Sequence, residues 1–335
     1  MANIYDVARR AKVSVATVSA VVNDSAYVSP LLRARVTRAI RDLAYTPNLL
    51  ARSLATQQSR MLGVIVPDIA NPFWPAVLRG AEDRAHAAGY TLLLSNSDDD
   101  PRKQELYLRL FLANRVDGIL LAGAPGADLS PARGSGSPAL VQLLRVDPDY
   151  DSDAVLMDDE DGAYEAVSHL LRLGYRRIPI VSGPAKVDTA ARRLVGYRRA
   201  LKEWGIEPDP ALECYGDFRV RSGYDAALVL LKKRPEALFV ANYLMAVGVM
   251  QAIRQYRLRC PHDVALVTCD DHPWMESFSP RLTTVNFPKY ELGSEAVRVL
   301  LDRLEAPDRT LQRVELRSVL AIRDSCGAAL RDQVM

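Results

Sequence analysis

The 335-residue chain has few of the residues that build metal sites, disulfide frameworks or membrane spans. Its four cysteines form no Cys-x-x-Cys pair and have no histidine cluster beside them, so we expect no zinc site, no disulfide framework and no metal or cofactor. No stretch reaches the roughly 18 apolar residues that a membrane span requires. The first residues lack a basic segment followed by an apolar run, which argues against export and predicts a cytoplasmic protein.

Motifs of common catalytic sites are missing too. The chain has no Gly-x-Ser-x-Gly, no phosphate-binding loop and no His-Glu-x-x-His motif. Gly134 and Gly136 lack the third glycine and the strand-to-helix setting of a dinucleotide site. The few histidines are scattered rather than clustered. The sequence therefore predicts a protein that is not an enzyme.

The small net charge of +2 conceals an asymmetry along the chain. Residues 1–60 carry nine basic and three acidic side chains, a net charge of +6. The other 275 residues carry 34 basic and 38 acidic side chains, a net charge of −4. A small basic head on a mildly acidic body is typical of a DNA-binding domain attached to a second domain.

Within this head, residues 4–11 place apolar side chains at the i, i+3, i+4, i+7 spacing of one helix face. Lys12 and Val13 form a turn, and Ser14 is a suitable N-cap for a second helix. That helix is expected to turn small and weakly polar side chains outward, which suits entry into a major groove. These outward residues are Val15, Ala16, Ser19, Ala20 and Asn23, opposite the inward Val18, Val21 and Val22. The pattern predicts a helix-turn-helix.

A third helix follows, with Ser29 as N-cap and Pro30 at its first position. Its outer face carries arginines that can reach phosphates and so position the head without reading sequence. These are Arg33, Arg35, Arg38 and Arg41. Residues 47–59 then contain a helix-competent segment that is too short to be stable alone.

The order of these residues resembles the LacI/GalR (lac-repressor/galactose-repressor) family of bacterial transcription regulators, which open with a pattern close to DVA..AGVS..TVS.VLN. Lys12 stands where the family usually has glycine, and a left-handed residue there costs roughly 1 kcal/mol. Ala20 replaces a common arginine, which removes one possible contact to DNA. The matching residues are Asp6-Val7-Ala8, Ala11, Val13-Ser14, Thr17-Val18-Ser19 and Val21-Val22-Asn23.

The resemblance implies that residues 47–59 form a hinge helix, which orders when two copies pair over the operator. Leu54 matches a family leucine that enters the minor groove at a central C-G step, where unstacking costs a few kcal/mol. Leu49, Leu50 and Leu54 could instead be packing residues. The residues expected to contact DNA are Tyr5, Ser14, Val15, Ala16, Thr17, Ser19, Ala20, Asn23, Asn48, Ala51, Arg52 and Leu54.

From Met61 onward, short apolar strands alternate with helices, which predicts parallel sheets covered on both faces. Two such rounds in tandem indicate two similar subdomains with a ligand held between them. The expected strands are 62–66, 90–94, 118–121, 178–181, 238–241 and 264–268. The expected helices are 72–88, 102–115, 162–173, 189–204, 220–233 and 244–256, and residues 123–138 are expected to form a loop.

Further motifs extend the resemblance over nearly the whole chain. The segments that match family patterns are 67–74, 116–120, 158–163, 169–178, 270–271 and 282–285. The implied fold is α/β: an N-terminal three-helix helix-turn-helix head plus a periplasmic-binding-protein-like core of two doubly wound parallel-sheet subdomains, between which the chain crosses three times.

The expected domains are a head (1–46), a hinge helix and linker (47–59), a core for effector binding and dimerisation (60–325) and a short tail (326–335). Subdomain one covers about 60–156 and 286–313. Subdomain two covers about 157–285 and 314–325, with its last strand near Val314–Ile322.

Candidate effector contacts follow from family positions and from the planar polar groups and aromatic faces that hold sugars. Asp270 could instead cap a turn, Arg193 could be a buried ion pair and Trp74 could be a core residue. Arg192 beside Arg193 could favour an anionic effector such as a sugar acid. The candidates are Asn71, Phe73, Trp74, Asp159, Arg192, Arg193, Tyr243 and Asp270, of which Asp159 and Tyr243 depart from the family's usual asparagine and aspartate.

The sequence thus predicts a ligand-responsive, sequence-specific transcriptional regulator. We expect a repressor that binds a palindromic operator with a central C-G step as a homodimer, controlled by a sugar-like metabolite in the core cleft. The alternatives are an enzyme or a solute-binding protein with an appended DNA-binding head. A nucleophile–base pair inside the cleft would favour the enzyme.

Overall fold

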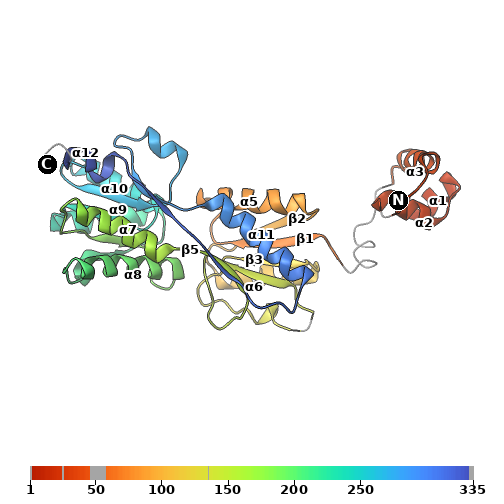
Figure 1. The fold of residues 1–335 in the computed structure, drawn as a ribbon, viewed down its shortest axis with the longest axis horizontal. Coiled ribbons are helices and arrows are strands. Elements are labelled where there is room, and N and C mark those ends of the chain that lie inside the picture. Colours follow the sequence, from red (N-terminus) through yellow and green to blue (C-terminus); the bar gives the residue numbers. More distant parts are fainter. Residues whose placement is uncertain (1, 25, 46–57, 135, 332–335) are drawn as a thin grey trace. The chain divides into compact units, whose positions relative to one another are not determined.

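The computed structural model describes residues 2–24, 26–45, 58–134 and 136–331, within two separate units, Met1–Ser59 and Arg60–Met335 (Figure 1). In the described part, no helix has both the length and the apolar character that crossing a membrane needs. The head contains three helices, α1 (Ile4–Ala11), α2 (Val15–Asn23) and α3 (Pro30–Asp42). Fully buried Val7, Val18 and Val36 contribute one residue from each helix to its core.

The predicted helix-turn-helix is confirmed in its geometry. Lys12 has the left-handed backbone of a tight turn, with φ of 51°. The Ser14 hydroxyl caps α2 by accepting from the Thr17 backbone N–H at 3.1 Å. Ser29 precedes α3 as predicted, but its side chain makes no capping hydrogen bond. Val15 was expected on the outward face, yet it is half-buried against the core of the head because the first turn of α2 lies close to that core.

The first core sheet has six parallel strands in the order β11-β5-β4-β3-β1-β2. Helices α5 (Phe73–Ala87) and α11 (Lys289–Glu305) pack on one face, and α6 (Pro101–Ala113) with η1 (Ser130–Ala132) packs on the other. The α5 and α11 backbones touch, since a Cβ on Gly80 would lie 1.9 Å from the Tyr290 carbonyl oxygen. The strands are β1 (Met61–Val66), β2 (Thr91–Asn96), β3 (Gly118–Leu121), β4 (Ala139–Leu143), β5 (Asp153–Met157) and β11 (Arg313–Leu316).

The second sheet has the order β12-β10-β9-β8-β6-β7, and every neighbouring pair is parallel except β10 and β12. Helices α7 (Asp159–Arg172) and α8 (Asp188–Glu203) cover one face, and α9 (Val220–Leu230) and α10 (Tyr243–Gln255) cover the other. The strands are β6 (Ile180–Ser182), β7 (Glu213–Tyr215), β8 (Ala237–Val240), β9 (Ala265–Cys269), β10 (Thr283–Asn286) and β12 (Val319–Ala321). Short elements follow as η2 (Pro210–Leu212), η3 (Leu231–Lys233), η4 (Pro273–Ser277), η5 (Asp324–Cys326) and α12 (Ala328–Arg331).

Three segments connect the two sheets, between β5 and α7, between β10 and α11, and between β11 and β12 (Figure 1). The Ser318 backbone N–H donates to Asp158 at 2.8 Å and so joins the first and third segments. A Cβ on Gly162 would lie 2.8 Å from the Ser318 hydroxyl and 2.9 Å from Val285, so a glycine is needed where these segments meet. The three segments that connect the sheets therefore pack against one another.

The structure corrects several sequence predictions. The stretch expected as one strand of subdomain two, near Val314–Ile322, is two strands, of which β11 completes the first sheet and β12 the second. Strands β4, β5, β7 and β10 and helix α11 were not predicted. Cys326, assigned to a tail, is fully buried, and its carbonyl accepts a hydrogen bond from the Tyr175 hydroxyl at 3.2 Å. The segment assigned to the tail, residues 326–335, therefore begins as part of the core.

Candidate functional site

On the head, the predicted DNA-contacting side chains differ in exposure. Tyr5 is 65% exposed, and Ser14 and Ala16 are also exposed. Thr17, Ser19 and Ala20 are partly exposed, and the Thr17 hydroxyl bonds the Ser14 hydroxyl at 2.9 Å. The Asn23 side chain and all of Asn48, Ala51, Arg52 and Leu54 lie outside the described residues.

The basic side chains of the head divide into two groups. Each acid of the head already has a partner: Asp6 pairs with Arg9, Asp42 with Arg10 and Asp24 with Arg33. Arg35 donates to the carbonyls of Ala11 and Lys12 and so holds the turn rather than reaching outward. Among the described residues of the head, the cations other than Arg35 that have no acidic partner are Lys12, Arg38 and Arg41.

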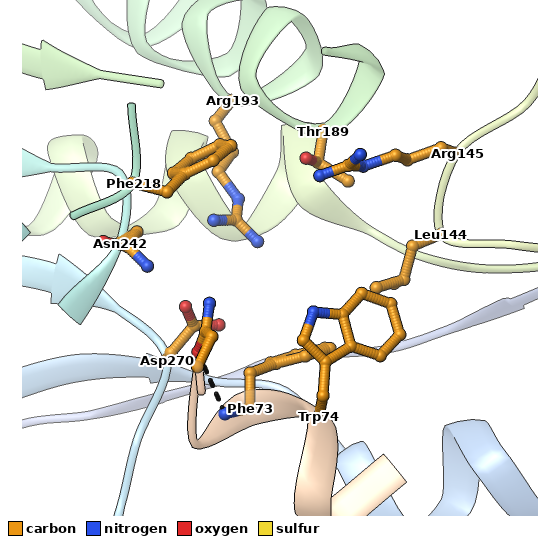
Figure 2. A pocket seen from close by; sticks show the side chains of 10 residues that line it. Phe73, Trp74, Leu144, Arg145, Thr189, Arg193, Phe218, Asn242 and Asp270 are labelled. Carbon is orange, nitrogen blue, oxygen red and sulfur yellow. Dashed lines mark hydrogen bonds between the residues drawn. The ribbon is translucent and has the colours of Figure 1, made fainter. Parts of the chain in front are cut away.

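In the core unit, a small cleft that is open to solvent lies between the two subdomains (Figure 2). Five of the eight predicted effector residues line it together. Polar side chains face aromatic rings across the cleft, which is the combination that binds small polar molecules. The lining residues are Asn71, Phe73, Trp74, Leu144, Arg145, Thr189, Arg193, Phe218, Asn242 and Asp270.

Three of these lining residues have a strained backbone. Leu144, Phe218 and Asp270 have φ of 65°, 64° and 70°, in the left-handed region that favours glycine. Such a conformation costs about 1–3 kcal/mol per residue and is retained chiefly at functional sites. The Phe218 ring also needs Gly183 beneath it, since a Cβ there would lie 2.1 Å from the ring. Each subdomain therefore contributes a left-handed residue to the cleft, and nine other non-glycine residues of the described chain have the same conformation elsewhere.

The amide side chains of the cleft have their acceptors engaged and their donors available. The Asn71 Oδ1 accepts from the Phe73 backbone N–H at 3.0 Å, near the start of α5. The Asn242 Oδ1 caps α10 by accepting from the Met245 backbone N–H at 2.9 Å. Asp270 is buried, and its Oδ1 has no partner in the described part of the chain. The cleft thus offers two amide donors and one carboxylate acceptor to a ligand.

Arg193 and Asp159 form a buried ion pair at the wall of the cleft. The Arg193 Nε donates to Asp159 Oδ1 at 2.7 Å, and a second guanidinium nitrogen donates to the Ala241 carbonyl. The guanidinium also lies 5.0 Å from the centre of the Phe287 ring. Burial outweighs the attraction of Arg193 and raises the pKa of Asp159 to about 6. Burial disfavours the charge of Arg193 itself, but the Asp159 carboxylate reverses this and raises the guanidinium pKa.

Three predicted effector residues do not line the cleft. Asp159 lies behind Arg193 and is fully buried. Arg192 turns away and pairs with Glu315. Tyr243 packs its ring 4.4 Å from that of His272, and burial raises the pKa of its hydroxyl. These residues neighbour or support the cleft rather than forming its surface.

Sequence reasoning missed half of the cleft. Asn242 and Thr189 had a local signal, because Asn242 follows a predicted strand and Thr189 precedes Arg193 by one helical turn. Leu144 and Arg145 follow β4, which was not predicted. No sequence pattern pointed to Phe218.

Comparisons with known proteins agree with this arrangement. A family model described as bacterial regulatory proteins, lacI family, matches residues 3–48, and one described as a periplasmic binding protein-like domain matches residues 167–326. The ribose operon repressor of Escherichia coli is 36% identical over 329 residues, which cover 97% of this chain and 100% of that protein. The repressor PurR of Photobacterium profundum is 34% identical and covers 97% of this chain and 98% of its own length.

A solved structure of the lac repressor dimer, bound to operator and the anti-inducer ONPF, is similar at a TM-score of 0.87. It is 29% identical and covers 97% of this chain and 99% of its own. The resemblance therefore extends over head and core together, and these relatives are repressors rather than enzymes. The chain belongs to the lacI family of bacterial regulatory proteins and is a DNA-binding, ligand-responsive transcriptional repressor.

Proposed function

We propose that the chain represses transcription as a homodimer on a palindromic operator with a central C-G step, and that a small neutral sugar in the core cleft controls this binding. Two-fold symmetry would set two α2 helices in successive major grooves, roughly 34 Å apart. The dimeric, operator-bound state of the similar lac repressor supports this assembly. Since such operators lie on the bacterial chromosome, we place the protein in the cytoplasm.

The second part of the proposal concerns the hinge segment, residues 47–59, which joins the head to the core. Leu54 would wedge into the central C-G step, and the few kcal/mol needed to unstack it would be offset by the contacts that the opened groove permits. An effector that binds one arrangement of the two subdomains better would change whether paired hinges form. A coupling of about 1–3 kcal/mol is enough for such control.

The chemistry of the cleft supports a neutral sugar. The Asp270 carboxylate oxygen without a partner carries this proposal, because a sugar hydroxyl is the donor that it lacks. Asn71 and Asn242 supply donors to other hydroxyls, and Trp74 and Phe218 supply apolar ring faces. The relative that represses the ribose operon is consistent with this class.

The alternative of an anionic sugar acid depended on Arg192. Its guanidinium pairs with Glu315 and does not line the cleft, so it adds no positive charge there. The two arginines that do line the cleft are also engaged, Arg193 with Asp159 and Arg145 with Asp99. A neutral ligand suits this balance of charge.

Thermal unfolding of the full chain tests the effector class. Tryptophan fluorescence reports on the core alone, because all three tryptophans (Trp74, Trp204 and Trp274) lie in Arg60–Met335. A ligand at a hundred times its Kd should add about 2.7 kcal/mol, visible as several degrees in Tm. Ribose and other neutral sugars are compared with sugar acids and with purine bases. A shift only with purines or only with sugar acids would overturn the neutral-sugar assignment.

Asp270→Asn is the matched variant. Losing a charged hydrogen bond of about 1.5–3 kcal/mol should weaken sugar binding roughly 10- to 150-fold. Operator affinity without sugar should stay as in the wild type, because Asp270 lies in the core unit. Unchanged sugar affinity would move the binding site elsewhere.

A further inference from the structure

Two consecutive arginines of α8 make ion pairs in different parts of the core. Arg193 stays within its own subdomain, where it pairs with Asp159 and lines the cleft. Arg192, one residue earlier, pairs with Glu315 of β11. Helix α8 covers the second sheet, whereas β11 is an edge strand of the first sheet. The Arg192–Glu315 pair therefore joins the two subdomains through side chains.

The Arg192 guanidinium is largely withdrawn from water. Its side chain is 20% exposed, against 46% for Glu315, and its Nη1 is buried without a hydrogen-bond partner in the described residues. Burial disfavours the charge, but the hydrogen bond to Glu315 and the charge of Asp159 outweigh burial and raise the guanidinium pKa. Because water and salt screen a half-buried pair less than an exposed one, this pair contributes more than a typical surface ion pair.

A second ion pair between the subdomains is weaker. Arg219, just before α9, and Asp68, just after β1, approach to 3.9 Å, and their side chains are 60% and 30% exposed. Exposed pairs at such a distance contribute little, because water screens the attraction and long side chains lose freedom. Arg192–Glu315 is thus the stronger of these two links.

Both partners of the Arg192–Glu315 pair are fixed to their own subdomain. Helix α8 touches α7, since a Cβ on Gly196 would lie 2.0 Å from the Glu160 carbonyl oxygen, and α7 directly follows the first connecting segment. Glu315 lies in register with Leu156 of β5, just before the third connecting segment. Rotation of one subdomain against the other must therefore change the distance between the paired groups. The pair favours the arrangement in which it forms.

From this we infer that Arg192 and Glu315 form a latch between the subdomains, which holds the core in one arrangement and so sets how strongly the protein binds its operator. A ligand that favours another arrangement has to break the pair, so the latch adds to the free energy that ligand binding must supply. Neither side chain belongs to the described lining of the cleft. The latch therefore acts whichever small molecule occupies the cleft.

The operator affinity of the full-length protein, measured without any sugar, tests the latch. The probe is a palindrome with a central C-G step that the wild type enriches from a random DNA library. Arg192→Gln and Glu315→Gln should each change this affinity at least threefold, in the same direction. Direct attraction to DNA predicts opposite directions, because the first variant removes a positive charge and the second a negative one. The double variant should match the single ones, since the pair is already broken in each.

Hydrogen exchange followed by mass spectrometry tests the latch without DNA. The Ser318 N–H donates to Asp158 and joins two of the connecting segments, so the peptide that contains it should exchange at least threefold faster in both single variants. Arg192→Lys keeps the positive charge and should restore the wild-type rate within twofold. Arg199→Gln is the matched control, because Arg199 lies on the same helix and pairs with Glu160 and Asp161 of its own subdomain.

Several outcomes would overturn the latch. Unchanged exchange at Ser318 in both single variants would do so, as would changes in operator affinity of opposite sign. Effects that add in the double variant would show that the two side chains act independently. Equal effects in Arg199→Gln would assign the change to a less stable α8. A wild type that enriches no such palindrome would overturn the proposed operator instead, and the exchange rates would then decide on the latch.

Discussion

Replacing Arg193 with methionine removes the positive member of the ion pair at the cleft wall. The pair is dry, since the side chains of Arg193 and Asp159 are 7% and 0% exposed. Breaking such a pair by removing one partner costs about 3–5 kcal/mol, because Asp159 must then either stay charged without compensation or take up a proton at a pH where it is otherwise ionised. We expect the free energy of unfolding of the core to fall by this amount at pH 8, measured by urea denaturation with tryptophan fluorescence in the absence of sugar.

The free energy of unfolding that Arg193→Met loses should increase as the pH rises. In the wild type the Asp159 pKa is already raised to about 6 by burial, against a reference value of 3.8. Without Arg193 the native pKa rises further, because an attractive charge is gone. Below about pH 6 both native proteins hold the Asp159 proton, so this part of the difference vanishes. Above that pH the variant retains the proton that the wild type loses, and the difference grows by at most about 1.4 kcal/mol per pH unit.

A double variant separates charge from packing. In Asp159→Asn/Arg193→Met no carboxylate remains at position 159, so more than half of the pH 8 loss should be recovered and the growth of the loss above pH 6 should disappear. The remaining loss reports the Arg193 contacts with the Ala241 carbonyl and the Phe287 ring. A loss under about 1 kcal/mol at pH 8, or one that is flat between pH 5.5 and 8, would refute the description of Asp159 as a dehydrated charge that depends on Arg193.

Three further predictions concern the head and hinge. Leu54→Ala should lower operator affinity at least about tenfold in a mobility-shift assay while sparing the dimer, and unchanged affinity would refute the wedge. Three unpaired cations per protomer should give a log–log salt slope of about −5 for DNA binding, which Arg41→Ala should make shallower by about 2. Arg33→Ala, which removes a cation already paired with an acid, is the control and should change the slope less. Ser14→Ala removes the cap on the Thr17 N–H and should destabilise the head by about 0.5–2 kcal/mol, measured by far-ultraviolet circular dichroism.

Local chemistry explains why the head was predictable. A hydroxyl cap at Ser14 and apolar spacing on two short helices act within a few residues, so they can be read along the chain. The alternation of strands and helices was equally visible in most of the core. It did not reveal which sheet a strand joins: β11 and β12 are separated by only Arg317 and Ser318, yet they complete different sheets. Pairing partners are set by the whole fold, not by neighbouring residues.

The residues of the cleft likewise divide into those that the sequence predicted and those that it did not. Asn71, Phe73 and Asp270 were found from the sequence because they match family positions, and in the fold they follow strands that end at one edge of a sheet. Arg192 was predicted to contact the effector but does not line the cleft, because its side chain projects roughly 100° around helix α8 from that of Arg193. Phe218 and Arg145 lie in loops, and the sequence alone does not show that these loops meet at the cleft. The sequence by itself thus determined the family, the helix-turn-helix and the alternating core, whereas only the tertiary structure decided which side chains meet in the cleft, since that depends on contacts between segments far apart in the chain.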